Sequence, residues 1–291
     1  MRLLPAATAV LALCVLATPA AARKVTPTYY VSLGTSLSVG VQPNSAGRSV
    51  ETKEGYADRL FALERPSHKG LRLAKLGCGG ETTTSMLNGG ICQYSGERRL
   101  GYSRKRKGAQ LKAAEAFLRA HAGRIAFVTI DIGANDILRC AKAKGTIDLP
   151  CVTAALETIK KNVPAIAKRL RKAAGSKTTV VGMTLYNPFL ALYFDQDTRG
   201  LADASVMLAR NLNASLTDGF TTNGIGKVAD VARAFQSDDR TPTTYQGQSV
   251  PLDVERICTL TWMCVFKPVG PNVHANVEGY KLIARTFAPL V

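Results

Sequence analysis

The sequence predicts an α/β protein with a mostly parallel β-sheet that is covered by helices on both faces. Short segments rich in β-branched and aromatic residues alternate along the chain with longer segments of helical periodicity. Several of the short segments end at glycine-rich turns, and no low-complexity linker interrupts residues 23–291. Strands that alternate with helices form parallel sheets, because the helical crossovers pack on the two faces. We therefore expect residues 23–291 to form one domain.

Strands are expected where β-branched and aromatic residues form short runs. The first of them, Thr28–Leu33, leads directly into a glycine-flanked turn over residues 34–40. The other expected strands are residues 71–76, 125–130, 178–185 and 227–231. In parallel sheets covered on both faces, binding and catalytic sites form at the carboxyl ends of the strands. The residues just after each strand should therefore meet at one edge of the sheet.

Helices are expected over residues 55–63, 110–120, 152–173, 201–216 and 275–287. The periodicity is clearest in residues 152–173, whose large apolar residues fall on one helical face: Ile159, Val163, Ile166 and Leu170. These helices separate the expected strands, as the parallel-sheet prediction requires.

The first 22 residues have the pattern of a secretory signal peptide. Arg2 precedes an apolar run over residues 3–17, and small residues follow over residues 18–22. The run is short for a transmembrane helix and ends in residues that break helices. We expect cleavage after Ala22 and export of residues 23–291.

Six of the seven cysteines lie in residues 23–291, an even number in a chain expected to reach an oxidising compartment. Their order along the chain suggests three local disulfides, which are Cys78 with Cys92, Cys140 with Cys151, and Cys258 with Cys264. A zinc site needs short, paired cysteine or histidine spacings, and neither the cysteines nor the three histidines have them. We therefore expect disulfides, no metal site and no other cofactor.

The formal charge of +17 at pH 7 favours anionic partners. The densest basic segment is Arg98–Lys107, for which we consider contact with acidic lipid or cell-wall polymer and, as the favoured alternative, a solvated loop that leads into a helix. Nucleic-acid binding is not expected, because no aromatic stacking pattern accompanies the charge. We expect a monomer that acts on a small-molecule or lipid ester.

Four residues have the chemistry of a serine hydrolase. Ser36 lies between glycines at a strand-to-helix turn, where its hydroxyl can be exposed as a nucleophile and its N–H can bind an oxyanion. Gly80 can present a second N–H without a side chain in the way, and Asn135 can add a donor from its side chain. His274 is the candidate general base. Each residue alone also fits a structural role, so the prediction depends on their joint order along the chain.

This order resembles the SGNH, or GDSL, hydrolase family over nearly the whole of residues 23–291. The resemblance rests on four blocks, which are Leu33-Gly34-Thr35-Ser36-Leu37, Leu76-Gly77-Cys78-Gly79-Gly80-Glu81-Thr82-Thr83, Asp131-Ile132-Gly133-Ala134-Asn135-Asp136, and Val273-His274-Ala275-Asn276 with Gly279-Tyr280. The segment Cys258–Cys264, with Trp262 and Met263, resembles the secreted bacterial lipase and esterase branch, whose members carry three local disulfides. The resemblance implies a flavodoxin-like, three-layer α/β/α sandwich, metal-independent ester hydrolysis and the four roles given above.

Two places depart from the family pattern. Thr35 stands where the family has an aspartate before the serine, a position that mainly shapes the turn. Family members usually also have an aspartate two or three residues before the histidine, where this chain has Asn272 and Pro271. Without that acid, the imidazolium formed during the reaction loses an electrostatic partner.

Some members of the family orient the histidine with a backbone carbonyl instead. We therefore predict that the Pro271 carbonyl accepts a hydrogen bond from His274 Nδ1. The alternative acceptors are the Asn272 side chain and a carboxylate from elsewhere, such as Asp253 or Glu255.

The expected function is a secreted esterase or lipase that cleaves carboxylic esters through an acyl-enzyme on Ser36. A second hypothesis is a polysaccharide acetyl-esterase that acts on cell-wall or plant glycans. A third is a non-hydrolytic binding protein that kept the fold after losing the catalytic acid. A serine-reactive probe at Ser36 separates the third hypothesis from the others, and a panel of esters of rising acyl length separates the first two.

Overall fold

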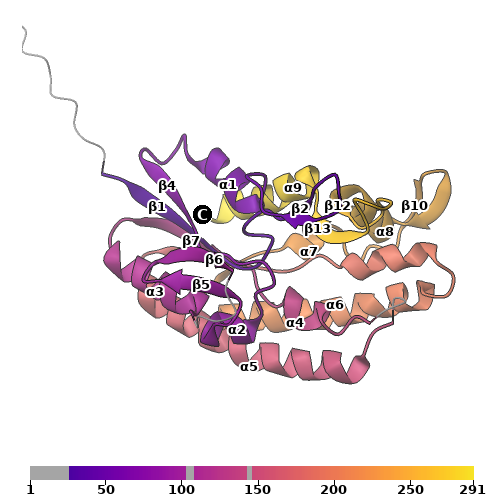
Figure 1. The fold of residues 1–291 in the computed structure, drawn as a ribbon, viewed down its shortest axis with the longest axis horizontal. Coiled ribbons are helices and arrows are strands. Elements are labelled where there is room, and N and C mark those ends of the chain that lie inside the picture. The colour runs from indigo at the N-terminus through magenta and orange to yellow at the C-terminus, as the bar shows by residue number, and fades with distance from the viewer. Residues whose placement is uncertain (1–25, 103–107, 143–145) are drawn as a thin grey trace, which may run out of the picture.

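A five-stranded, parallel sheet forms the centre of the molecule, with the strand order β4-β1-β7-β8-β9 (Figure 1). The structure is a computed structural model that describes residues 26–102, 108–142 and 146–291. The strands are β1 (Thr28–Leu33), β4 (Leu71–Lys75), β7 (Ile125–Ile130), β8 (Thr179–Met183) and β9 (Lys227–Ala229). Numbered along the chain, these strands have the order 2-1-3-4-5 of flavodoxin-like sheets. The predicted fold class is confirmed.

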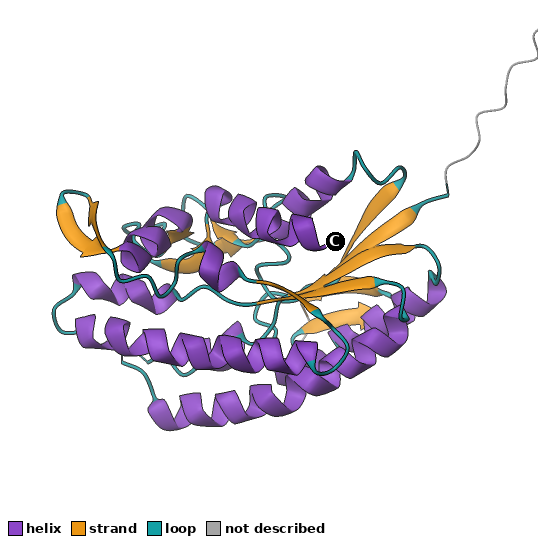
Figure 2. Cartoon of the chain, turned by 180° about the vertical axis from the view of Figure 1, so that it is seen from behind, coloured by secondary structure: helices purple, strands orange, loops and turns teal. Residues whose placement is uncertain are grey.

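Helices cover both faces of the sheet (Figures 1 and 2). On one face α1 (Tyr56–Glu64) packs against α9 (Val277–Phe287). On the other face α5 (Leu149–Ala174) packs between α3 (Gln110–Ala120) and α6 (Arg199–Thr221). The core therefore lies in two layers, one on each side of strands that are buried on both faces.

The remaining elements are short. The helical ones are α2 (Thr83–Asn88), α4 (Ala134–Leu138), η2 (Pro188–Phe194), α7 (Val231–Ala234), α8 (Leu252–Leu260) and η3 (Ala288–Leu290). The strands form antiparallel pairs: β2 (Gln42–Pro43) with β3 (Ser49–Val50), β5 (Cys92–Ser95) with β6 (Arg98–Tyr102), β10 (Pro242–Tyr245) with β11 (Gln248–Pro251), and β12 (Thr261–Trp262) with β13 (Asn272–Ala275). Such short elements have too few residues for a periodic pattern to predict them.

One structural expectation about His274 is wrong. It lies on β13, which ends at Ala275, whereas the helix expected over residues 275–287 would begin directly after His274. The helix begins at Val277 because Asn276 caps it, with the Asn276 side chain accepting a hydrogen bond from the Gly279 N–H at 3.0 Å. The antiparallel pairing of β12 with β13 therefore holds His274 in extended backbone.

The three expected disulfides are all present. They join Cys78 to Cys92, Cys140 to Cys151, and Cys258 to Cys264. The expected signal peptide, residues 1–22, lies outside the described residues, as do residues 103–107 of the basic segment. Within the described residues, every helix is too short or too polar to cross a bilayer.

Candidate active site

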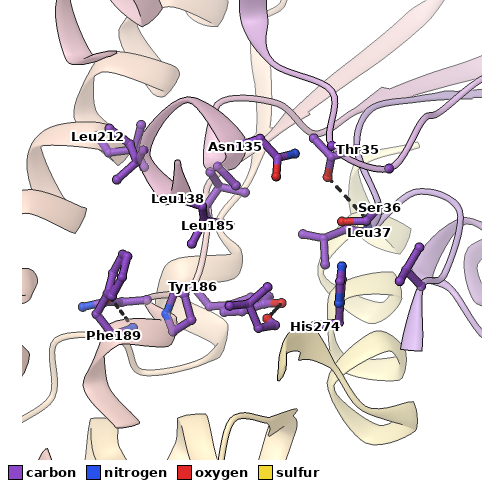
Figure 3. Close-up of a pocket in the computed structure, with 18 of the residues that line it drawn as sticks. Thr35, Ser36, Leu37, Asn135, Leu138, Leu185, Tyr186, Phe189, Leu212 and His274 are labelled. Atoms are coloured by element: carbon purple, nitrogen blue, oxygen red, sulfur yellow. Dashed lines mark hydrogen bonds between the residues drawn. The ribbon is translucent and has the colours of Figure 1, made fainter. Parts of the chain in front are cut away.

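The four candidate catalytic residues meet at the carboxyl ends of the sheet strands. Ser36 follows β1, Gly80 follows β4 and Asn135 follows β7, while His274 reaches the same place from β13. All four line a single cavity of about 360 Å³ (Figure 3). In Figure 3 the side chains of Ser36 and His274 point toward one another, with Asn135 on the same side of the cavity. The structure thus brings together residues that lie far apart in the sequence.

The turn that carries Ser36 is shaped by a buried carboxylate. Asp131 Oδ2 accepts hydrogen bonds from the Thr35 N–H at 3.0 Å and from Thr35 Oγ1 at 2.5 Å. Gly34 has a φ of +139°, and a methyl group there would fall 2.0 Å from Asp131 Oδ1, so glycine is required. The carboxylate that the family carries before the serine is therefore replaced by a threonine that binds an aspartate from the end of β7.

Two further buried residues hold this turn and are not predicted from the sequence. Gln110, at the start of α3, accepts from the Gly34 N–H at 2.6 Å and donates to the Gly34 carbonyl at 2.9 Å. The Tyr56 hydroxyl donates to Asp131 Oδ1 at 2.8 Å. Burial raises the pKa of Asp131 to about 6, although Thr35 and Tyr56 both donate hydrogen bonds to it. No sequence signal marks Gln110, because its partner lies 76 residues away.

The candidate oxyanion donors are held by their own loops. Gly80 has a φ of +81°, and a methyl group there would have the Ile91 side chain as its nearest neighbour, at 4.0 Å. The positive φ at this position therefore favours glycine, although a side chain would have space there. Asn135 uses its Nδ2 to donate to the Glu81 carbonyl at 2.9 Å. Because a side-chain amide has two N–H groups, one N–H can hold Asn135 in place and the other can face a ligand.

His274 is oriented by Asn272. Its Nδ1 lies 2.6 Å from Asn272 Oδ1. The prediction that the Pro271 carbonyl accepts this hydrogen bond is therefore wrong, and the acceptor is the alternative that we considered, the Asn272 side chain. The reason is local, since Asn272 Oδ1 also accepts from the His274 N–H at 3.1 Å and is thereby held over the ring. The carboxylate of Asp253 pairs instead with Arg240, at 3.2 Å, and Glu255 lies 3.6 Å from Arg256.

The direction of the Asn272 amide decides which nitrogen of His274 carries the proton. Asn272 Nδ2 donates to Ser49 Oγ at 3.1 Å, which turns Oδ1 toward the histidine. An oxygen can only accept, so Nδ1 is protonated and Nε2 is left with a free lone pair. Burial lowers the pKa of His274 to about 4, so the ring is neutral near pH 7. This is the state that a general base needs.

The cavity has one apolar end and one polar edge. Away from Ser36 it is lined by apolar side chains of α4, α5, α6, η2 and the loop after β8: Ile137, Leu138, Val152, Leu185, Phe189, Leu208, Ala209 and Leu212. Figure 3 shows Leu138, Leu185 and Leu212 on the side of Asn135 that faces away from Ser36 and His274. Ser49, Glu51 and Tyr102 form the polar edge beside the serine. Within the described residues, no three His, Cys, Asp or Glu side chains are grouped closely enough to hold a metal ion.

Comparisons with known proteins agree with this arrangement. The family model described as GDSL-like lipase/acylhydrolase matches residues 30–287. An extracellular lipase from Streptomyces rimosus has a similar structure, with 20% identity, a TM-score of 0.54, and coverage of 91% of this chain and 100% of that one. Phospholipase A1 from Streptomyces albidoflavus also has a similar structure, with 15% identity, a TM-score of 0.56, and coverage of 91% of this chain and 100% of that one. No curated protein matches the sequence significantly. The two structures show the shared fold, and the family match shows that this chain belongs to the GDSL-like lipase/acylhydrolase family.

Proposed function

We propose that the protein is a carboxylic ester hydrolase that takes the acyl chain of its substrate into the apolar end of the cavity. The observation that supports this most strongly is the cavity itself, which begins at Ser36 and continues between α4, α6 and η2 with apolar walls. A cavity lined by leucine, isoleucine and phenylalanine binds an aliphatic chain by the hydrophobic effect and offers little to a sugar ring. The acyl part of the ester would enter this end, and the alcohol part would lie at the polar edge.

In this mechanism Ser36 Oγ attacks the ester carbonyl carbon while His274 Nε2 takes the hydroxyl proton. The N–H groups of Ser36 and Gly80 and the Asn135 amide stabilise the negative oxygen of the tetrahedral intermediate. The intermediate collapses to an acyl-enzyme when the C–O bond to the alcohol breaks and the imidazolium returns its proton to the leaving oxygen. Water then attacks the acyl-enzyme by the same steps and releases the carboxylic acid.

We further propose that the enzyme is exported and acts as a monomer outside the cell. The signal-like pattern of residues 1–22 supports export, as do the three disulfides, which persist in oxidising compartments. N-terminal sequencing of the protein recovered from the culture medium tests this directly, because cleavage after Ala22 would leave Arg23 as the first residue.

The acyl-chain proposal predicts how activity depends on the ester. With p-nitrophenyl esters of rising chain length, we expect kcat/KM to increase about fourfold for each methylene that enters the cavity, since each buried methylene contributes about 0.8 kcal/mol. A strong preference for the acetyl ester would contradict this and would favour the polysaccharide acetyl-esterase. No turnover of any ester would favour the non-hydrolytic binding protein.

A single substitution in the cavity wall sharpens this test. Ala209 on α6 lines the cavity, so Ala209→Phe should fill part of the apolar end. We expect activity on long-chain esters to fall at least tenfold while activity on the acetyl ester is retained. Ala204 is exposed on the same helix, and Ala204→Phe is the matched control that should leave the chain-length profile unchanged.

Because Asn272 binds His274 Nδ1, we expect Asn272→Asp to increase kcat rather than to lower it. A carboxylate next to Nδ1 raises the pKa of His274, so the acidic limb of the pH profile should move upward by about one to three pH units. The carboxylate also stabilises the imidazolium better than an amide does, so kcat at neutral pH should rise. Kinetic pH profiles of the two proteins measure both effects.

Ser49 acts in this scheme as a positioning residue, because it fixes which end of the Asn272 amide faces His274. Ser49→Ala should lower kcat about two- to tenfold in the natural background, the value of one hydrogen bond. In the Asn272→Asp background it should have no effect, because the two carboxylate oxygens are equivalent. The exposed Ser45 lies in the same hairpin, and Ser45→Ala is the control. An equal effect of Ser49→Ala in both backgrounds would contradict the positioning role.

A further inference from the structure

Exposed hydrophobic side chains gather beside the polar edge of the cavity, Ser49, Glu51 and Tyr102, which we call its mouth. Among the residues that the structure describes, nine large hydrophobic side chains are exposed, and five of them lie on β3, on β6 and on a loop that touches the β2–β3 hairpin. These are Val50, Leu100, Tyr102, Val265 and Phe266, and Phe266 is 86% exposed. Single exposed apolar side chains are ordinary, whereas a cluster of them beside a binding site indicates a contact surface.

The three segments are in contact with one another. Glu51 joins β3 to β6, because its carboxylate accepts from both terminal nitrogens of Arg99, at 2.7 and 2.5 Å, and from the Tyr102 hydroxyl at 3.2 Å. The loop over residues 265–270 touches the hairpin of β2 and β3 at Gly47, where a methyl group would fall 1.8 Å from the Pro268 carbonyl oxygen. The segments therefore form a continuous border from β6 through β3 to this loop.

The same border carries unpaired positive charge. Arg48, Arg98 and Lys267 are exposed on these segments, and none has an ion-pair partner in the described parts of the chain. The nearby carboxylate of Glu51 is paired with Arg99. We call these three cations and the five hydrophobic side chains together the mouth rim. Its charge and its apolar side chains match a surface that offers both anions and hydrocarbon.

We propose that the mouth rim docks the enzyme onto an anionic lipid bilayer. Phe266 and Leu100 enter the headgroup region, and Arg48, Arg98 and Lys267 bind lipid phosphates. A zwitterionic bilayer offers the cations no net negative charge, and a soluble polyanion leaves the apolar side chains in water. This docking rests on the proposed function, since it places the opening at Ser36 against lipid whose esters would enter the cavity.

Binding to vesicles of ether-linked lipids tests the docking separately from catalysis, because these lipids contain no ester to cleave. We expect the full chain to sediment with vesicles that contain ether phosphatidylglycerol and not with vesicles of ether phosphatidylcholine alone. Added salt should weaken the binding. Replacing Arg48, Arg98 and Lys267 together with glutamine should weaken it about a hundredfold, since each cation near an anionic membrane contributes about fivefold. Phe266→Ser should weaken it about tenfold or more.

Two substitutions far from the mouth are matched controls. Leu63 is exposed near the end of α1, and Lys177 is exposed in the loop after α5, so Leu63→Ser and Lys177→Gln should bind vesicles like the natural protein. The triple glutamine variant and Phe266→Ser change no residue that lines the cavity, so both should still hydrolyse a soluble short-chain ester at the natural rate. If that hydrolysis is absent in the natural protein while vesicle binding persists, the proposed function fails and the docking stands.

Three results would overturn the docking. The first is no binding to anionic vesicles, and the second is an equal loss of binding in the rim variants and the controls. The third is that soluble polyphosphate binds as tightly as the vesicles do and that Phe266→Ser weakens neither the polyphosphate binding nor the vesicle binding. The mouth rim would then be a site for soluble polyanions.

Discussion

His274→Ala is expected to lower kcat by about 10⁵- to 10⁶-fold, the effect of removing the base from a serine nucleophile. The structure explains why one histidine should matter this much. His274 is the only histidine among the cavity-lining residues, and Asn272 Oδ1 holds its Nδ1 at 2.6 Å so that Nε2 is the free nitrogen. Without it, the Ser36 hydroxyl keeps its proton and is a weak nucleophile at neutral pH. Steady-state kinetics on a soluble ester measures the loss.

The other two histidines are matched controls for this change. His68 and His121 each place Nδ1 near a backbone carbonyl of a helix end, at 3.1 Å from Glu64 and 2.9 Å from Phe117. Both helix ends lead into the amino-terminal ends of strands, so these rings lie at the sheet edge away from the cavity. His68→Ala and His121→Ala should leave kcat within about threefold of the natural value. If His274→Ala also kept a kcat within about threefold of the natural value, His274 could not be the general base.

The same residue is expected to set the pH dependence of kcat/KM. Because burial lowers the pKa of His274 to about 4, the neutral base is present at pH values above this and is lost as the pH falls through it. The acidic limb should therefore have its midpoint near pH 4 rather than near pH 6.5, the ordinary value for histidine. A midpoint at the ordinary value would show that the ring is solvated in the free enzyme.

Asn135→Ala is expected to lower kcat about a hundred- to a thousandfold while KM changes little. The Asn135 amide would donate to an oxygen whose negative charge exists only in the transition state, so its loss affects turnover more than substrate binding. Folding should be largely preserved, because the change removes one hydrogen bond to the Glu81 carbonyl and leaves the core intact. Kinetics and thermal unfolding of the same preparation separate the two effects.

Asn211 is exposed on α6, and Asn211→Ala is the control for this substitution. Asn135→Asp keeps the size of the side chain but places an oxygen where the donor was, so it should be as inactive as the alanine variant. A fall in thermal stability that accounts for the lost activity would instead make Asn135 a structural residue.

The sheet and the long helices are predictable from the sequence because their side chains repeat with the period of the backbone. Thr28–Leu33 is found as predicted, and the helix expected over residues 152–173 becomes α5 (Leu149–Ala174). Since sites in parallel sheets form at the carboxyl ends of the strands, the sequence already predicts that Ser36 and Asn135 lie close together. The disulfides follow as well, since each pair is close in the sequence.

The parts that the sequence does not predict depend on contacts between distant segments. Gln110 binds the turn at Gly34, and Ser49 binds Asn272 across 223 residues, so no local pattern reveals either contact. The Asn272 side chain competes with the Pro271 carbonyl for one histidine nitrogen, and only the folded geometry decides between them. The missing aspartate at position 35 is likewise replaced from another strand end, by Asp131.

Covalent labelling of Ser36 is the most direct test of the proposed chemistry. The natural protein is treated with a fluorophosphonate, and its intact mass and peptides are measured by mass spectrometry. We expect one phosphonyl group per chain, on the peptide that contains Ser36, with labelling lost in Ser36→Ala and strongly slowed in His274→Ala. Ser38→Ala should label normally, because the Ser38 hydroxyl is buried and donates to the Thr35 carbonyl at 2.7 Å. Labelling at another residue, or ester hydrolysis that persists in Ser36→Ala, would contradict Ser36 as the nucleophile.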